Sequence, residues 1–202
     1  MIKGYYFVTD AGLSKNGNRS DVKSAIEAGV SVVQYRSKTS KMEFLLEEIK
    51  TLKNICEGKA LFIINDIVGA ALSVDADGVH VGQGDMPYET ARKLLGKTKT
   101  IGVTVHDLKE AVLAEKKGAD YLGVSPIFST TTKHDAGAPC GIELIKEIKK
   151  NCTVPVTAIG GITLDNVKEV VDAGADAVCA ISAVLTKDDV KKEIEKFQAL
   201  FN

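Results

Sequence analysis

Short apolar runs alternate with longer amphipathic stretches from one end of the chain to the other. Each run holds four or five residues, mostly Val, Ile, Ala and Tyr, as expected of strands buried on both faces. The longer stretches carry apolar residues three or four positions apart, as in Phe44, Leu45, Ile49 and Leu52, which is the spacing of an amphipathic helix. The pattern predicts eight strands, at residues 5–8, 31–35, 60–64, 78–81, 100–103, 121–124, 154–158 and 177–180.

A weak internal repeat marks the joints between these elements. Residues 27–33, 117–123 and 173–178 each pass from the end of a helix, through a glycine, into an apolar strand, and residues 74–79 are a looser copy. Glycine in the left-handed conformation commonly ends a helix. The recurrence predicts repeated βα units rather than separate α and β layers.

Eight units in 202 residues leave about 25 residues per unit, which is enough for a minimal barrel. We therefore predict a single-domain (β/α)₈ TIM barrel over residues 1–202. A doubly wound open sheet is the alternative. Eight units suit closure better, and no GxGxxG motif follows the first predicted strand.

Composition narrows the classes of partner. The chain is 45% hydrophobic and 26% charged, with a formal net charge of -1, so it has no general basic field for nucleic acid or a membrane. The N-terminus has no leader-like pattern, and no apolar run reaches the roughly 18 residues of a membrane span. We expect a cytoplasmic protein with four free cysteines. No interface signature is evident, which leaves a homo-oligomer open.

Loops that follow the strands build the active site in barrels of this kind. The polar residues at those positions include Gln34, Arg36, Lys38, Asn65, Asp66, Gln83, Asp85, Thr104, His106, Thr130, Thr132 and Lys133. Gln34, Arg36 and Lys38 alternate along an extended segment, so they project to the same side. Two cations there suit a diphosphate, and the alternative is a solvated strand end.

Asp66 and Asp85 follow neighbouring strands, so the two carboxylates can converge. Mg²⁺ typically takes one or two protein carboxylates and fills its shell with water and phosphate oxygens. The alternative is that each aspartate caps the helix that follows it.

A second anion site is expected from the later loops. Residues 124–135 form a long loop with hydroxyls and Lys133, which suits phosphate binding, or else a plain flexible loop. The pair Gly160-Gly161 and the pair Ile181-Ser182 follow the last two strands, where barrels commonly bind phosphate on backbone amides.

The three histidines have less specific environments. We interpret His80 as an interior histidine and His134 as an exposed loop residue, whereas His106 is either an acid–base group or a loop hydrogen-bonder. The residues alone thus predict a barrel with one monophosphate-like site and one diphosphate-like site, with a metal at the second.

With these features in place, the chain resembles the thiamine phosphate synthase family over nearly its whole length. The motifs that carry the resemblance, in order, are Val8-Thr9-Asp10, Gln34-Tyr35-Arg36-Ser37-Lys38, Ile64-Asn65-Asp66, residues 78–87, Ile101-Gly102-Val103-Thr104, residues 123–128 with Thr130-Thr131-Thr132-Lys133, and residues 158–162.

The resemblance implies a Mg²⁺-dependent transferase of thiamine biosynthesis. It would join hydroxymethylpyrimidine diphosphate to hydroxyethylthiazole phosphate, with loss of diphosphate to leave a pyrimidine-methyl cation that the thiazole nitrogen captures. Asp66 and Asp85 would hold Mg²⁺. The implied substrate-binding residues are Gln34, Tyr35, Arg36, Ser37, Lys38, Asn65, Thr104, Thr130, Thr131, Thr132, Lys133, Gly161, Ile181 and Ser182, of which Arg36, Lys38, Thr104 and Lys133 would act in catalysis.

Three positions depart from the family pattern: Ser37 replaces a usual Glu, Gly84 a frequent acidic residue, and Thr104 a usual Ser. None removes a metal ligand or a cation. The nearest rival is a thiazole tautomerase of the same superfamily, which needs no metal–diphosphate site. Another phosphate-binding barrel isomerase and a non-catalytic thiamine-phosphate binder are more distant alternatives.

Overall fold

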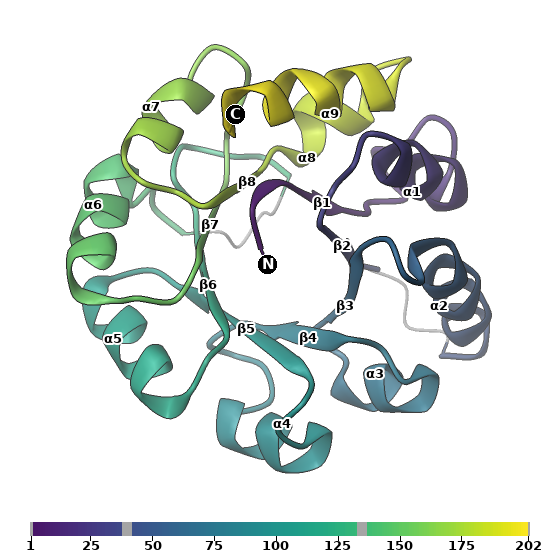
Figure 1. Ribbon diagram of the computed structural model, residues 1–202, viewed down its shortest axis with the longest axis horizontal. Coiled ribbons are helices and arrows are strands. Elements are labelled where there is room, and N and C mark those ends of the chain that lie inside the picture. Colours follow the sequence, from purple (N-terminus) through teal and green to yellow (C-terminus); the bar gives the residue numbers. More distant parts are fainter. Residues whose placement is uncertain (1, 38–41, 133–136, 202) are drawn as a thin grey trace.

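The computed structural model is a closed barrel of parallel strands surrounded by helices (Figure 1). It describes residues 2–37, 42–132 and 137–201. The strands are β1 (Gly4–Val8), β2 (Val32–Tyr35), β3 (Leu61–Asn65), β4 (Gly78–Val81), β5 (Thr100–Val105), β6 (Tyr121–Val124), β7 (Val156–Ile159) and β8 (Ala177–Cys179). Every predicted strand is present, with ends within two residues of the expected ones.

The strands pair in sequence order, and β1 pairs with β8 through Gly4 opposite Ala177 and Tyr5 opposite Val178. This last ladder closes the sheet. The predicted barrel is therefore confirmed, and the open doubly wound sheet is excluded.

Helices follow the strands and cover the outside of the barrel. They are α1 (Asn18–Glu27), α2 (Met42–Cys56), α3 (Val68–Val74), α4 (Tyr88–Leu95), α5 (Leu108–Lys117), α6 (Gly141–Asn151), α7 (Val167–Asp172), α8 (Ile181–Leu185) and α9 (Val190–Gln198), with a short 3₁₀ turn at Ala199–Phe201. None of the helices in the described part of the chain is both long and apolar enough to cross a membrane.

Left-handed residues make the predicted joints between helices and strands. Gly29, Gly118 and Gly174 have φ angles of 76°, 98° and 102°, which glycine adopts without a steric penalty. In the looser copy of the repeat, Asp75 takes this role with φ 53°. Aspartate tolerates the left-handed region better than most residues because its side chain can hydrogen-bond locally.

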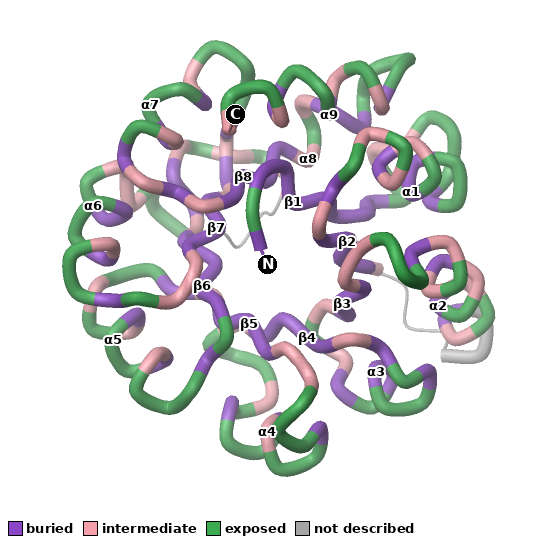
Figure 2. The backbone as a smooth tube through the Cα atoms, viewed as in Figure 1, coloured by how far each residue is buried: buried purple, intermediate pink, exposed green. Residues whose placement is uncertain are grey.

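Alternation along each strand divides the core into two parts. Tyr5 and Phe7 of β1 point outward into the layer between sheet and helices, whereas Tyr6 and Val8 point into the barrel. The inner cluster consists of Ile2, Tyr6, Val8, Val32, Ile63, Tyr121, Ala177 and Cys179. Figure 2 shows the buried ring of strands and the exposed outer surfaces of the helices. The inner cluster thus occupies the interior of the barrel.

Candidate active site

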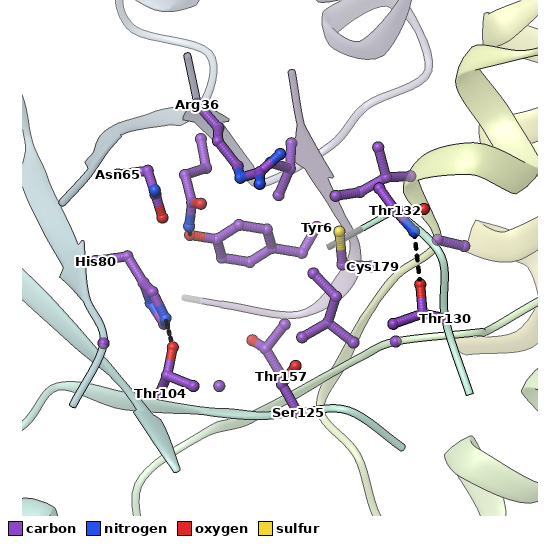
Figure 3. Close-up of a pocket in the computed structure, with 18 of the residues that line it drawn as sticks. Tyr6, Arg36, Asn65, His80, Thr104, Ser125, Thr130, Thr132, Thr157 and Cys179 are labelled. Carbon is purple, nitrogen blue, oxygen red and sulfur yellow. Dashed lines mark hydrogen bonds between the residues drawn. The ribbon is translucent and has the colours of Figure 1, made fainter. Parts of the chain in front are cut away.

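A cavity of about 370 Å³ opens at the carboxyl ends of the strands. Its lining residues include Arg36, Asn65, His80, Thr104, Thr130, Thr132 and Ser182, which come from the ends of several strands and from the loops and the helix that follow strands. Figure 3 shows Arg36, Asn65, His80 and Thr104 on one side of Tyr6, with Thr130 and Thr132 on another. The barrel thus brings together the two groups of residues that the sequence assigned to two anion sites.

Alternation at the end of β2 decides which residues of the basic segment face the cavity. Gln34, Arg36 and Ser37 line it. Tyr35 lies on the outer face of β2, where its hydroxyl donates to Glu48 Oε2 at 2.5 Å. The structure therefore does not support the predicted substrate contact of Tyr35, because its neighbours on both sides occupy the inward positions and its own side chain points away from the cavity. Lys38 lies outside the described residues.

Arg36 is held by the loop after β1. Its Nη1 lies 2.9 Å from Oδ2 of Asp10, a residue only 4% exposed. Thr9 Oγ1 accepts from the Arg36 amide at 2.9 Å and donates to its carbonyl oxygen at 3.1 Å. A buried carboxylate and a backbone clasp thus fix the direction of the guanidinium before a ligand arrives. Asp10 belongs to the motif Val8-Thr9-Asp10, for which the sequence alone predicted no role.

Asp66 and Asp85 both line the cavity, and neither caps a helix. Ile67 and Pro87 occupy the cap positions of α3 and α4. The Asp66 amide donates to the His80 carbonyl at 2.8 Å, which keeps the end of β3 beside β4. Gly82 N donates to Asp85 Oδ2 at 2.8 Å, and Asn65 Nδ2 donates to Asp66 Oδ2 at 2.5 Å.

This set of oxygen donors suits a hard cation such as Mg²⁺. Asp66, Asp85 and Asn65 all line the cavity, and they follow or end the neighbouring strands β3 and β4. No group of three or more Cys, His, Asp and Glu side chains that could enclose a metal occurs among the described residues. Two protein carboxylates still fit Mg²⁺, which keeps several waters and takes further ligands from phosphates.

The hydroxyl residues divide by exposure. Thr104 is the fifth residue of β5 and lines the cavity, as do Thr130 and Thr132 of the loop after β6. Thr131 is exposed and not among the lining residues, so the expected contact from Thr131 has no support in the structure. Lys133 and His134 lie outside the described residues.

Gly160 and Gly161 line the cavity with φ angles of 110° and 63°. A Cβ on Gly160 would come within 2.6 Å of Pro126, and one on Gly161 within 2.4 Å of the Ser129 carbonyl oxygen. These glycines are therefore required by close packing against the loop after β6, and not only by room for an anion. Ile181 and Ser182, at the start of α8, line the cavity beside them.

His80 is both interior and part of the cavity wall. It is 9% exposed and makes hydrogen bonds of 2.9 Å to Tyr121 Oη and 2.8 Å to Thr104 Oγ1. His106 lies at the rim, 44% exposed, with Nδ1 at 3.0 Å from Glu110 Oε2. The same Glu110 carboxylate accepts from the His106 amide. His106 is thus held by the first turn of α5.

The sequence analysis missed most of the cavity floor. Tyr6, Tyr121, Thr157 and Cys179 line it, all on inward positions of strands. Their signal was the strict inside–outside alternation, which distinguishes Tyr6 from Tyr5 once β1 is known to be in a barrel. Burial raises the pKa of the Cys179 thiol, so this cysteine behaves as an apolar wall residue.

Comparisons with known proteins agree with this geometry. A family model described as thiamine monophosphate synthase matches residues 5–184. The thiamine-phosphate synthase of Methanosarcina barkeri is 53% identical over 193 residues, covering 96% of this chain and 88% of that protein. The thiamine-phosphate synthase of Chloroflexus aurantiacus is 47% identical over 197 residues, covering 96% of this chain and 91% of that protein.

A solved structure supports the same conclusion. Thiamine phosphate pyrophosphorylase from Pyrococcus furiosus superposes with a TM-score of 0.89 at 39% identity, covering 98% of this chain and 94% of that one. The sequence match and the structural match both extend over nearly the whole barrel, including the strands that carry the cavity. The chain belongs to the thiamine monophosphate synthase family.

Proposed function

We propose that this protein is a transferase that joins hydroxymethylpyrimidine diphosphate to hydroxyethylthiazole phosphate, giving thiamine phosphate and diphosphate. One observation carries the proposal. A single cavity is lined both by Arg36, Asp66 and Asp85 and by Thr130, Gly161 and Ser182, as two phosphorylated substrates that must meet would require. Its four unpaired cysteines suit work in a reducing cytoplasm.

The diphosphate belongs on the side of Arg36. A guanidinium offers paired donors to phosphate oxygens. The ion pair between Arg36 and Asp10 holds the guanidinium in one orientation. Ser37, Asn65 and Thr104 supply further polar groups around the same space. Lys38 and Lys133 enter this proposal from the sequence alone, because both lie outside the described residues.

Asp66 and Asp85 would hold Mg²⁺ at this site, with diphosphate oxygens and water as the other ligands. When bound, Mg²⁺ neutralises charge that develops on the departing diphosphate. The chain contributes two carboxylates that follow adjacent strands and line the same cavity, and neither of them occupies a helix cap position.

The thiazole phosphate belongs at the opposite rim. Thr130 and Thr132 line the cavity together with Gly161, Ile181 and Ser182, and the loop that carries the two threonines packs against Gly161. Backbone amides and hydroxyls there can donate to a monophosphate, as in other barrels that bind phosphate after the last two strands. Holding this substrate in place puts its ring nitrogen beside the pyrimidine before the reaction starts.

In the reaction, the bond between the pyrimidine methylene carbon and the diphosphate oxygen breaks, and the thiazole nitrogen forms the new bond to that carbon. The electron pair leaves with the diphosphate, where Arg36 and Thr104 can stabilise it. No enzyme nucleophile takes part. The inner walls, with Tyr6, Ile159 and Cys179, exclude water that would compete for the cationic carbon.

A coupled assay tests the proposal. Purified protein is mixed with both substrates and Mg²⁺, and thiamine phosphate and diphosphate are measured with an EDTA control. We expect product that disappears with EDTA and returns with excess Mg²⁺. Interconversion of a thiazole carboxylate tautomer without condensation would replace the synthase with the tautomerase. Binding of thiamine phosphate without turnover would indicate a binding protein.

A further inference from the structure

A continuous chain of hydrogen bonds crosses the floor of the cavity. Gln34 Nε2 lies 2.9 Å from Tyr6 Oη, which lies 2.7 Å from Tyr121 Oη. Tyr121 Oη lies 2.9 Å from His80 Nδ1, and His80 Nε2 lies 2.8 Å from Thr104 Oγ1. The chain connects β2, β1, β6, β4 and β5, and all five side chains line the cavity. Figure 3 shows the bond between His80 and Thr104 at one end.

The direction of these bonds follows from the number of protons. An amide nitrogen only donates, so Tyr6 accepts from Gln34 and has one proton of its own to give. Among the described residues its other hydrogen-bond partner is Tyr121, so Tyr6 donates there. Tyr121 then donates to His80 Nδ1, and the ring is left with its proton on Nε2.

Reversing the donor and acceptor roles of the two tyrosines, with Gln34 kept in the same orientation, leaves a proton without an acceptor. If Tyr121 donated to Tyr6, the Tyr6 proton would have no partner among the described residues, on a side chain only 2% exposed. Leaving a buried donor unpaired costs its desolvation penalty without a compensating hydrogen bond. Burial also raises the pKa of both phenols, so neither loses its proton near neutral pH.

The last bond determines how Thr104 meets a ligand. With His80 Nε2–H donating to Thr104 Oγ1, the Thr104 hydroxyl must turn its own proton to another acceptor. Its backbone carbonyl accepts from Gln83 Nε2 at 2.7 Å, which holds the residue in place. Thr104 lines the cavity, so an acceptor on a bound ligand can take this proton.

We propose that Tyr6, Tyr121 and His80 are positioning residues that hold His80 in the Nε2–H form and commit the Thr104 hydroxyl to donate to an acceptor on the substrate. The inference rests on the proposed function for the identity of that substrate, in which an oxygen of the departing diphosphate is such an acceptor. A donor aimed there strengthens as negative charge develops.

Nitrogen NMR of ¹⁵N-histidine protein tests the direction without any substrate. The chain has three histidines, and the variants His106→Gln and His134→Gln assign the third set of signals to His80. We expect a neutral His80 ring with a bare Nδ1 and a protonated Nε2. A proton on Nδ1, or on both nitrogens, would overturn the proposal, since the chain would then run the other way.

Tyr121→Phe breaks the chain at its centre and keeps the ring. We expect the His80 Nδ1 signal to move as the ring begins to exchange between its two forms. Tyr88→Phe is the matched control, because Tyr88 is also buried but donates to the Gly118 carbonyl, away from the cavity. An unchanged His80 spectrum in Tyr121→Phe would contradict the relay. The wild-type spectrum decides the direction even if that variant fails to fold.

Kinetics then test whether the relay acts through Thr104. Tyr121→Phe should lower kcat/KM roughly tenfold, the effect of one hydrogen bond to a charged group. In a Thr104→Ala background the same change should have almost no effect, because the residue that it orients is gone. Losses that multiply in the double variant would overturn the proposal. A wild type with no synthase activity would refute the proposed function and leave the NMR result to stand.

Discussion

Asp66 shows how much one backbone angle constrains a functional residue. Its φ is 62°, in the left-handed region, and its amide bonds to β4 while its carboxylate lines the cavity. Asn and Asp tolerate this region better than other residues with a Cβ. An Asp66→Ala variant therefore mixes loss of a metal ligand with backbone strain.

Asp66→Asn separates the two effects. It keeps the size and the left-handed preference and removes the charge, so we expect turnover to fall about a hundredfold or more, with a melting temperature close to that of the wild type. The matched control is Asp75→Asn, a second left-handed aspartate (φ 53°), paired with Lys99 outside the cavity. Turnover of Asp66→Asn within a few-fold of the wild type would refute the Mg²⁺ assignment.

Asp21 carries a different kind of constraint, in a polar cluster between α1 and α2. It is 2% exposed, and its Oδ2 and the Oδ1 of Asn18 are both buried without a hydrogen-bond partner among the described residues. Burial raises the pKa of Asp21, against a smaller opposing effect of its hydrogen bond to Ser14. The folded state therefore favours the protonated form of this carboxyl.

Asp21→Asn should stabilise the protein at neutral pH by about 1 kcal/mol, since it removes a buried charge and adds a donor. Because its folded pKa is raised, Asp21 makes the wild type lose stability as pH rises above the unfolded value of about 3.9. The gap between variant and wild type should thus close in acid. Urea unfolding across this range measures it.

Asp188→Asn is the control with the opposite slope. A hydrogen bond from Lys15 lowers the pKa of this exposed carboxyl, so the native Asp188 adds stability above the unfolded pKa and loses it as pH falls. Its variant should be slightly less stable at neutral pH. Equal slopes for the two variants would contradict the assignment of Asp21.

At the scale of elements, backbone hydrogen bonds join the loop after β6 to the end of β7 and to the start of α6. The Ile127 and Phe128 amides donate to the Ile159 and Gly160 carbonyls at 3.0 Å. The Cys140 amide, just before α6, donates to the Pro126 carbonyl at 2.8 Å. Backbone from β7 and α6 thus positions the segment that presents Thr130 and Thr132 to the cavity.

Gly161→Ala should disturb this arrangement. The new Cβ would lie 2.4 Å from the Ser129 carbonyl oxygen and 2.8 Å from Phe128 Cβ, at a φ of 63°. We expect a loss of about 1–3 kcal/mol in the free energy of unfolding. The KM for the thiazole phosphate should rise more, relative to the wild type, than the KM for the diphosphate substrate.

Gly58→Ala isolates the backbone component of that loss. Gly58 has φ 69°, and an added Cβ would meet nothing within 4 Å. It should cost less stability than Gly161→Ala and leave both KM values unchanged. Equal losses in the two variants would show that packing against the loop contributes nothing.

At the scale of the molecule, closure of the barrel brings Arg36 and several hydroxyl donors to one mouth of a chain whose net charge is only -1. Anion binding must therefore be local. A ligand that binds the folded state alone stabilises it by about 2.7 kcal/mol at a concentration of one hundred times its Kd.

Inorganic diphosphate with Mg²⁺ should accordingly raise the melting temperature, and Arg36→Gln should abolish most of that increase. Each variant is compared with its own ligand-free form, because loss of Arg36 also leaves the buried Asp10 without its ion pair. Arg19→Gln, an identical charge change at an exposed position of α1, should respond like the wild type. An equal shift in all three proteins would place the diphosphate elsewhere.

The sequence alone was enough to predict the strands, the glycine joints and the barrel. These depend on periodicity and on local backbone preferences, which neighbouring residues determine. The sequence also predicted which polar and loop residues would lie at the mouth of the barrel. Those that the structure places in the cavity wall include Gln34, Arg36, Asn65, Asp66, Asp85, Thr104, Thr130, Thr132, Gly161, Ile181 and Ser182.

Tertiary structure decided the rest. Tyr35 faces α2, Asp10 orients Arg36, and Tyr6 joins Tyr121 and His80 beneath the cavity. Each of these contacts joins separate elements or loops of the fold, from 13 to 115 residues apart in the sequence, and a run of residues carries no signal for its partner in another element. Periodicity assigns a side chain to a face, but the closed sheet alone determines which side chains meet there.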